Sequence, residues 1–162
     1  MKKAPLIFVF LLLLITSACD KRAGYVYYMY NNTNYDIFAG YGLFYATYLY
    51  PDTSFEQLHN YELITSYSFN AHYVGEPLDE TIKQRMPRDT VSIFYFHADT
   101  VNKYPWEIIQ RDYKILQRYD LSSQDICTLK DHRGIPEIPY PPDERMKDMK
   151  MYPPYNELQI MP

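Results

Sequence analysis

The sequence predicts an α+β fold, and three patterns support this prediction. Residues Tyr61–Asn70 alternate between apolar and polar side chains, as in a strand with one wet face. Val91–Phe96 is a short apolar run that is typical of a central strand. From Trp106 to Tyr119, apolar residues return at helical spacing. We therefore expect an antiparallel sheet, single or sandwich-like, with a two-helix hairpin in the C-terminal half.

The N-terminal strands are expected in a segment rich in tyrosine. Nine of the 19 tyrosines lie between Tyr25 and Tyr50, and tyrosine favours half-buried, pleated surfaces. Tyr25–Tyr30 and Tyr35–Tyr50 read as strands, separated by the turn cluster Asn31–Asn34.

The first of these strands carries aromatic residues on both faces. Tyr25 and Tyr27 lie on one face, while Tyr28 and Tyr30 lie on the other. One face can line the core. The other must be covered by further structure or used to bind a sugar or a protein.

The expected helices begin after Pro105, a residue that suits a first helical position. The first helix carries the apolar stripe from Trp106 through Leu116. Ser122 can cap the second helix, with Asp125 three residues later, and Gly134 ends it. So short a link predicts an αα-hairpin that covers one face of the sheet.

Proline content sets the expectations for the loops and the C-terminal region. Gly75–Asp89 contains two prolines and reads as a loop or sheet edge. Ile135–Pro142 can only be an edge strand or a polyproline segment. We expect one domain over residues 25–142, followed by an extended, proline-rich tail over residues 143–162.

The N-terminus has the order of a secretory signal. Met1–Lys3 is cationic, Leu6–Ile15 is an unbroken apolar run, and Thr16–Ala18 supplies small residues before Cys19. The apolar run has ten residues, while a helix needs about 20 to cross the hydrocarbon core. Removal of residues 1–18 is therefore expected.

Cys19 would then become the first residue of the mature chain. Ile15–Cys19 resembles a lipobox, whose cysteine receives a diacylglyceryl thioether and an amide-linked chain such as palmitate. Thr16 departs from the usual pattern, in which leucine is commonest at this position. Ordinary signal peptidase could also cleave the bond between Ala18 and Cys19. We expect lipidation of Cys19 and a tether over residues 19–24. The alternative is a soluble secreted protein.

Several segments together resemble a family of small, uncharacterised lipoproteins from Gram-negative anaerobic bacteria. The resemblance covers roughly residues 50–142 and implies export and lipidation; it implies no activity. Its segments are Tyr50–Thr53, Asp89–Phe94, Ala98–Thr100, Trp106–Glu107, Tyr113–Leu121 and Tyr140–Pro142.

Charge and cysteine content narrow the function classes. The side-chain charge changes from −4 to −6 when Lys2 and Lys3 leave with the signal. An acidic domain repels phosphate backbones, so nucleic acid is not an expected partner. With Cys19 acylated, Cys127 is expected to be a free thiol in the core, without an intrachain disulfide.

The sequence predicts no catalytic, metal or cofactor site. His59, His72, His97 and His132 are too far apart for a helical zinc pair, and Cys127 has no neighbouring thiol. Nucleophile elbows, glycine-rich phosphate loops and dinucleotide fingerprints are missing from the sequence. Thr90 and Thr100 follow aspartates and resemble an O-glycosylation sequon; the alternative is that each Asp-Thr pair makes a local turn.

These patterns predict a non-catalytic lipoprotein of the cell envelope, anchored by its lipid in the outer rather than the inner membrane. The expected role is binding of a protein or glycan through the tyrosine-rich sheet. One alternative is an envelope hydrolase with a site assembled from scattered residues. Another is a structural subunit of a larger envelope complex.

Overall fold

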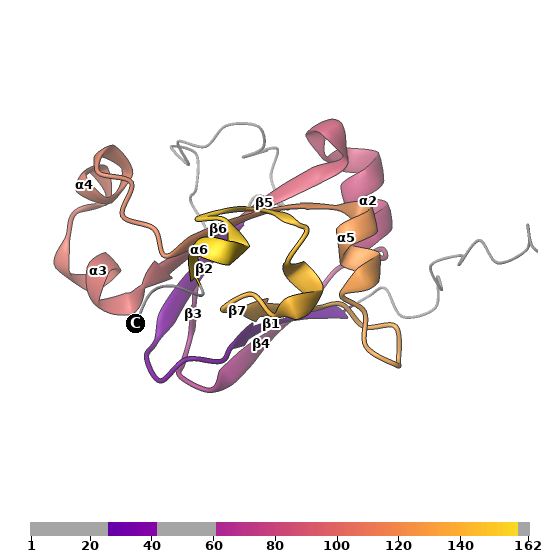
Figure 1. Ribbon diagram of the computed structural model, residues 1–162, viewed down its shortest axis with the longest axis horizontal. Coiled ribbons are helices and arrows are strands. Elements are labelled where there is room, and N and C mark those ends of the chain that lie inside the picture. Colours follow the sequence, from indigo (N-terminus) through magenta and orange to yellow (C-terminus); the bar gives the residue numbers. More distant parts are fainter. Residues whose placement is uncertain (1–25, 42–60, 159–162) are drawn as a thin grey trace, which may run out of the picture.

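The computed structural model describes residues 26–41 and 61–158. In these parts of the chain, two sheets pack face to face and helices lie at their ends (Figure 1). One sheet has the order β4-β1-β7 and contains β1 (Val26–Asn31), β4 (Ser68–Tyr73) and β7 (Glu137–Tyr140). The other has the order β3-β2-β5-β6-β8 and contains β2 (Ile37–Tyr41), β3 (Tyr61–Ile64), β5 (Thr90–His97), β6 (Gln117–Ser122) and β8 (Lys150–Tyr152).

The fold is α+β, as predicted. Each pair of neighbouring described strands is antiparallel except β1 and β7, which run parallel. The predicted signal, Cys19 and the tether lie outside the described residues, as do His59 and the second half of the predicted strand Tyr35–Tyr50. None of the described helices has the length and apolar character needed to cross a membrane.

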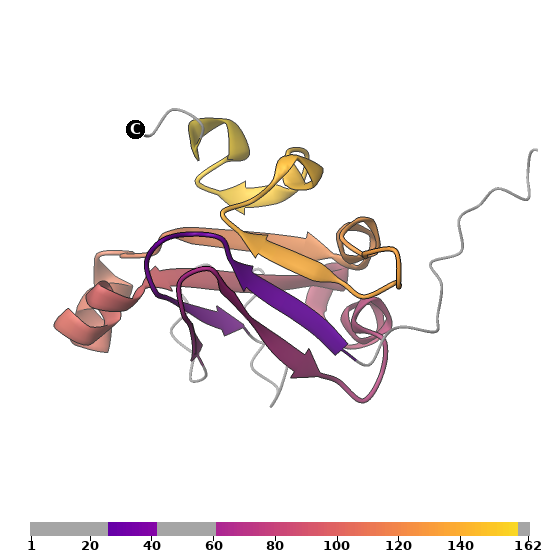
Figure 2. The same cartoon turned by 90° about the horizontal axis from the view of Figure 1, so that it is seen from below.

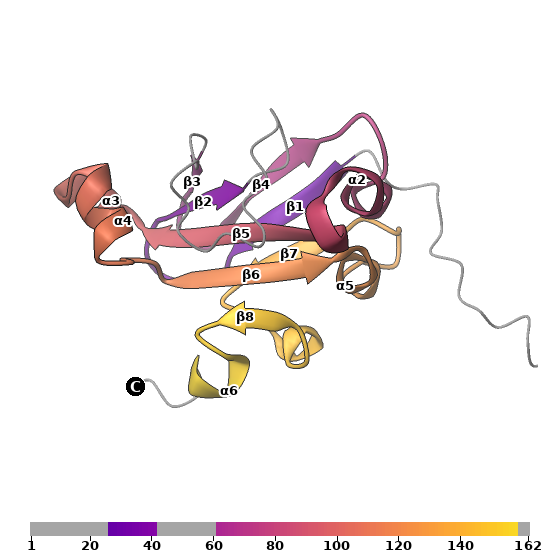
Figure 3. The same cartoon turned by 90° about the horizontal axis from the view of Figure 1, so that it is seen from above.

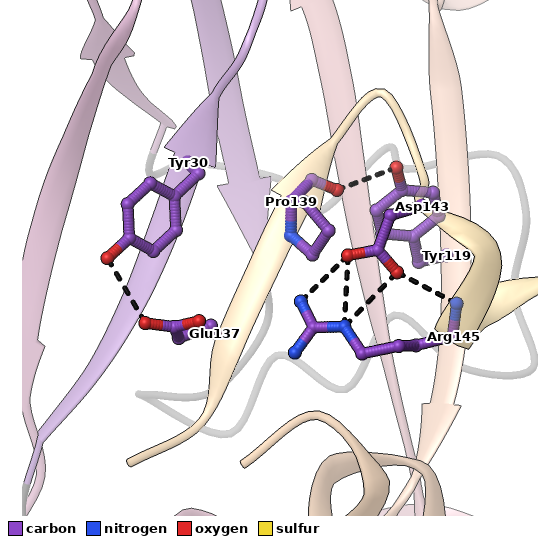
Figure 4. Close-up of polar contacts among 6 residues, drawn as sticks. All are labelled: Tyr30, Tyr119, Glu137, Pro139, Asp143 and Arg145. Atoms are coloured by element: carbon purple, nitrogen blue, oxygen red, sulfur yellow. Dashed lines mark hydrogen bonds and ion pairs between the residues drawn. The ribbon is translucent and has the colours of Figure 1, made fainter. Parts of the chain in front are cut away.

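Large aromatic residues fill the space between the two sheets. Tyr27 from β1, Tyr95 from β5 and Tyr119 from β6 are fully buried there. The ring of Tyr95 stacks on that of Tyr140 from β7, with centroids 5.0 Å apart. The hydroxyl of Tyr119 donates to the carbonyl of Pro139 at 3.0 Å, which fixes β7 to the core (Figure 4).

The central position predicted for Val91–Phe96 is confirmed, because β5 lies between β2 and β6 (Figure 3). Its six middle residues are all buried. Ile93 and Tyr95 face the other sheet. Phe94 and Phe96 point to the opposite face, where they pack with Ile109 of α4 (Trp106–Arg111). The helix α3 (Ala98–Lys103) connects β5 to α4.

The predicted helix hairpin is wrong. The first helix ends at Arg111, and Gln117–Ser122 forms β6, which separates it from the second helix, α5 (Ser123–Thr128). Tyr113 has φ 49°, a left-handed conformation that ends the helical path. Tyr119 lies in β6, where it is fully buried, so its helical spacing from Trp106 is a coincidence.

The predicted cap of α5 is confirmed. The Oγ of Ser122 accepts from the backbone N–H of Asp125 at 3.2 Å, and the Asp125 carboxylate accepts from the N–H of Ser122 at 2.8 Å. This reciprocal pair is a capping box. Leu121 and Ile126 are both buried beside it.

Part of the predicted loop Gly75–Asp89 is helical. The helix α2 (Leu78–Arg85) begins directly after Pro77 and packs on α5. Leu78 and Ile82, four residues apart, are buried on one face. A 3₁₀ helix, η2 (Pro87–Asp89), follows it. Here the two prolines lie at helix boundaries. The loop prediction took them instead as evidence against a helix anywhere in the segment.

The alternating segment Tyr61–Asn70 forms two strands rather than one. Tyr67 has φ 50°, and the chain turns there from β3 in one sheet to β4 in the other. The buried side chain of Asn31 holds this crossing, since its Nδ2 lies within hydrogen-bonding distance of the carbonyls of Tyr35, Ile64 and Thr65.

Residues 143–158 belong to the fold, unlike the extended tail predicted for residues 143–162. β7 is an edge strand, as expected from its prolines. After it come η3 (Glu144–Met146), β8 and α6 (Tyr155–Leu158). β8 pairs with β6, and Met146 and Met151 are buried in the core.

Candidate functional site

The outer side of the three-stranded sheet is the strongest candidate for a functional surface. Side chains alternate along a strand, so the even-numbered residues of β1 and the odd-numbered residues of β4 point away from the core. In Figure 2 this sheet lies in front, and none of the described helices crosses it. We define the aromatic face as these outward side chains: Val26, Tyr28, Tyr30, Phe69, Ala71 and Tyr73.

Three rings of the aromatic face form one cluster. Phe69 lies opposite Tyr30 in the strand register, and these two ring centroids are 5.2 Å apart. The ring of Tyr28 meets Phe69 edge-on at 5.2 Å and Tyr30 at 6.1 Å. These are favourable aromatic geometries, so the rings hold one another in place.

The aromatic face remains open to solvent. Phe69 keeps 49% of its surface exposed and Tyr73 keeps 81%, while Tyr28 and Tyr30 are half-buried. Single exposed apolar residues are ordinary, but contiguous patches mark interaction sites.

Polar groups border the cluster on its β7 side. Glu137 lies beside Tyr28 in the parallel register, and its carboxylate accepts from the Tyr30 hydroxyl at 3.3 Å (Figure 4). Burial and the charge of Glu137 raise the pKa of Tyr30, so its phenol stays a hydrogen-bond donor. Arg133, exposed in the preceding loop, adds a cation that is held by Asp131 at 2.7 Å.

A second polar cluster is formed by side chains from β1, β2, β3 and β4, and so from both sheets. The Tyr41 hydroxyl is 2.9 Å from Nδ1 of His72 and donates to Glu62 Oε1 at 3.2 Å. The ring of Tyr27 stacks on His72 at 4.8 Å. Burial lowers the pKa of His72, while Glu62 opposes this change. These contacts join the two sheets.

In the described part of the chain, this cluster brings a buried histidine next to a carboxylate, as the alternative hydrolase would require. It offers one histidine and one carboxylate. The only hydroxyl within hydrogen-bonding distance of His72 in the described structure is the phenol of Tyr41, whose pKa is raised by burial and by Glu62. A phenol that holds its proton is a poor nucleophile. The cluster therefore reads as structural.

The buried carboxylate of Asp120 is also explained by structure. Ser92 donates to it at 2.7 Å, and Arg118 and Lys150 approach it at 3.2 and 3.4 Å. These residues come from three neighbouring strands, β5, β6 and β8, which the charges tie together. Nowhere in the described parts of the chain do three His, Cys, Asp or Glu side chains gather as a metal site would require.

The two candidate O-glycosylation residues have different surroundings. Thr90 is half-buried in β5, and its hydroxyl donates to the carbonyl of Arg88 at 2.9 Å. Thr100 is half-buried in the middle of α3. In neither place does the Asp-Thr pair lie in an open loop.

Cys127 differs from its expected state. It lies on α5, half-buried, and is disulfide-bonded rather than a free core thiol. The chain's other cysteine, Cys19, lies outside the described residues.

The contribution of β4 to the aromatic face, and of β7 to its polar border, could not be anticipated. Tyr28 and Tyr30 were identified from the alternation in β1. Phe69 and Glu137 join them only through pairing between strands far apart in sequence. The alternation around Phe69 puts it on the apolar side of a strand, opposite the wet face, and so predicts a core position. In the structure 49% of its surface is exposed.

No protein-family model matches this chain, and neither the curated proteins nor the solved structures contain a significant match.

Proposed function

We propose that this protein is an exported, lipid-anchored component of the cell envelope that binds a glycan through its aromatic face. One observation carries the proposal: Tyr28, Tyr30 and Phe69 form a contiguous ring cluster on a sheet face that no described helix covers. Leaving such a cluster in water forgoes hydrophobic stabilisation, which a bound ligand would restore.

The polar border favours a glycan over a purely apolar partner. Sugar rings present C–H faces that pack on aromatic rings, together with hydroxyls that need hydrogen-bond partners. Tyr30 and Glu137 supply a phenol and a carboxylate directly beside the rings, and Arg133 supplies an exposed cation on the same side. Donors and acceptors are thus both available.

The anchor in this proposal is supported by the N-terminal sequence and by the resemblance to envelope lipoproteins. A sulfur that carries a thioether cannot also form a disulfide. If the bond on Cys127 is intrachain, it must use the Cys19 sulfur, because the chain has only two cysteines. Lipidation of Cys19 and a disulfide between Cys19 and Cys127 therefore exclude each other, and each makes a distinct prediction.

The proposal is tested with full-length protein purified in detergent and applied to an array of bacterial and host glycans. We expect binding to a defined set of glycans, weakened about tenfold or more by Tyr28→Ala together with Phe69→Ala, since loss of about 1.4 kcal/mol corresponds to tenfold. Tyr152→Ala is the matched control, because Tyr152 is a half-exposed tyrosine on β8 of the other sheet.

Two outcomes would contradict glycan binding. One is an array without specific signals. The other is a signal that the double variant and the Tyr152→Ala control reduce equally. If a photocrosslinker at Phe69 captures one protein in intact cells while the array stays silent, the aromatic face binds a protein instead.

A further inference from the structure

The described sheets have four edge strands, and three of them are poor templates for strand pairing. β7 contains Pro139 and follows Pro136. β8 has three residues, one of them Lys150. β3 has four residues, one of them Glu62. Prolines, charges and short lengths are the usual protections against edge-to-edge association.

The fourth edge strand, β4, lacks these protections. It has six residues, Ser68–Tyr73, and none is proline or a charged Lys, Arg, Asp or Glu. Among the described strands it pairs with β1 alone. Its outward side chains Phe69, Ala71 and Tyr73 are all exposed, and Tyr73 is the most exposed of the described large apolar residues.

We propose that β4 pairs antiparallel with β4 of a second copy of this chain, around a two-fold axis at Ala71. This inference is independent of glycan binding. It would join the two three-stranded sheets into one continuous six-stranded sheet, with the aromatic faces of both copies on the same side.

The side-chain pattern of β4 selects this register. Residues directly opposite each other in a sheet point to the same face. With the axis at Ala71, Phe69 of each copy faces Tyr73 of the other, and both point outward. Asn70 and His72 then face each other on the inner side. Moving the axis by one residue, to Asn70 or His72, keeps the two faces but pairs Phe69 or Tyr73 with Ala71 and loses both aromatic pairs.

The composition of β4 also suits a symmetric contact. The axis passes between the two Ala71 residues, whose small side chains let the two backbones approach closely. The strand carries no formal charge other than on a protonated His72, so no fixed like charges meet across the axis. Aromatic cross-strand pairs are among the favourable ones, and the symmetric register creates two of them.

Cysteine crosslinking in intact cells tests the register. Ala71→Cys places two thiols directly across the axis, so a disulfide-linked dimer is expected on a non-reducing gel. Asn102→Cys is the matched control, because Asn102 is exposed on α3, away from β4. The wild-type chain gives the baseline for its native cysteines. Equal crosslinking at both positions, or none at Ala71, would overturn the register.

The oligomeric state of the purified full-length protein is the second test. Light scattering in detergent should give a dimer for the wild-type chain and a monomer for Ala71→Glu, which places two carboxylates at the axis. Asn102→Glu, with the same change in charge, should remain dimeric. A monomeric wild-type protein, or an Ala71→Glu variant that stays dimeric with an unchanged circular dichroism spectrum, would refute pairing through β4.

Discussion

At the scale of single residues, we expect His72 to make the stability of this protein depend on pH. Tyr27, Tyr41 and Glu62 face it from β1, β2 and β3, and only 8% of its surface is exposed. Burial lowers its pKa below the ordinary value of 6.5, with Glu62 opposing. The native state therefore binds fewer protons than the unfolded state just below pH 6.5. The contribution of neutral His72 to the free energy of unfolding is fully present above this pH and decreases as the pH falls.

His72→Gln should reduce this pH dependence. We expect the free energy of unfolding of the wild-type protein to decrease between about pH 7 and pH 5, and that of the variant to decrease less over the same range. Urea denaturation at both pH values measures the difference. His132→Gln is the control, since His132 is exposed in a loop. Parallel curves for the wild-type protein and His72→Gln would show that His72 contributes nothing.

The residue scale also shows what local sequence can reveal about the site. Alternation alone assigned Tyr28 and Tyr30 to the face opposite Tyr27, and the structure agrees. The cluster around His72 had no local signal, because its members come from four strands. Tyr41, Glu62 and His72 are brought together by the crossing between the sheets, which the sequence pattern did not reveal.

At the scale of elements, the capping box of α5 should contribute measurably to stability. Ser122→Ala removes the side-chain acceptor for the Asp125 N–H, and loss of such a cap costs about 1 kcal/mol. Because α5 packs on α2, the loss should lower the midpoint of global denaturation. Gln124→Ala, an exposed change in the same helix, should leave the midpoint nearly unchanged. A midpoint for Ser122→Ala that equals this control would mean that the box is not formed in solution.

Elements set by local chemistry were predictable, and elements set by distant pairing were not. The cap at Ser122 and the proline-rich edge strand β7 follow from adjacent residues. The sequence predicts a helix across β6 because Trp106, Ile109 and Tyr113 recur at helical spacing. Leu116 and Tyr119 happen to continue the same spacing. What decides the conformation of β6 is hydrogen bonding to β5 on one side and β8 on the other, which a pattern within one segment does not encode.

At the scale of the whole molecule, the division between the two sheets explains why the aromatic face is open. The five-stranded sheet buries residues on both of its sides, against the other sheet and against α4. The three-stranded sheet contributes only the residues of its inner side to the core, and these include Tyr27, Met29 and Ile138. The aromatic residues on its outer side lie outside this core, which is why we assign binding to them.

The anchor is also a property of the whole molecule, and Cys19→Ala tests it. The Cys19 thiol is the acceptor of the diacylglyceryl group in the proposed lipidation, and a methyl group cannot replace it. We expect the variant to lose incorporation of a fatty-acid analogue and to leave the membrane fraction. The Cys127→Ala variant should keep the fatty-acid label and its place in the membrane fraction, because Cys127 lies within the folded domain on α5.

The competing state of Cys19 gives the outcome that would contradict lipidation. Peptide mapping of the wild-type protein without reduction would then find one linked peptide that contains both Cys19 and Cys127, and no lipidated N-terminal peptide. In that case Cys127→Ala would release a free thiol at Cys19, and the wild-type protein would take up no fatty-acid label. A labelled Cys19 would instead show that the sulfur of Cys127 is not bonded to it in the mature protein, because one sulfur cannot hold both bonds.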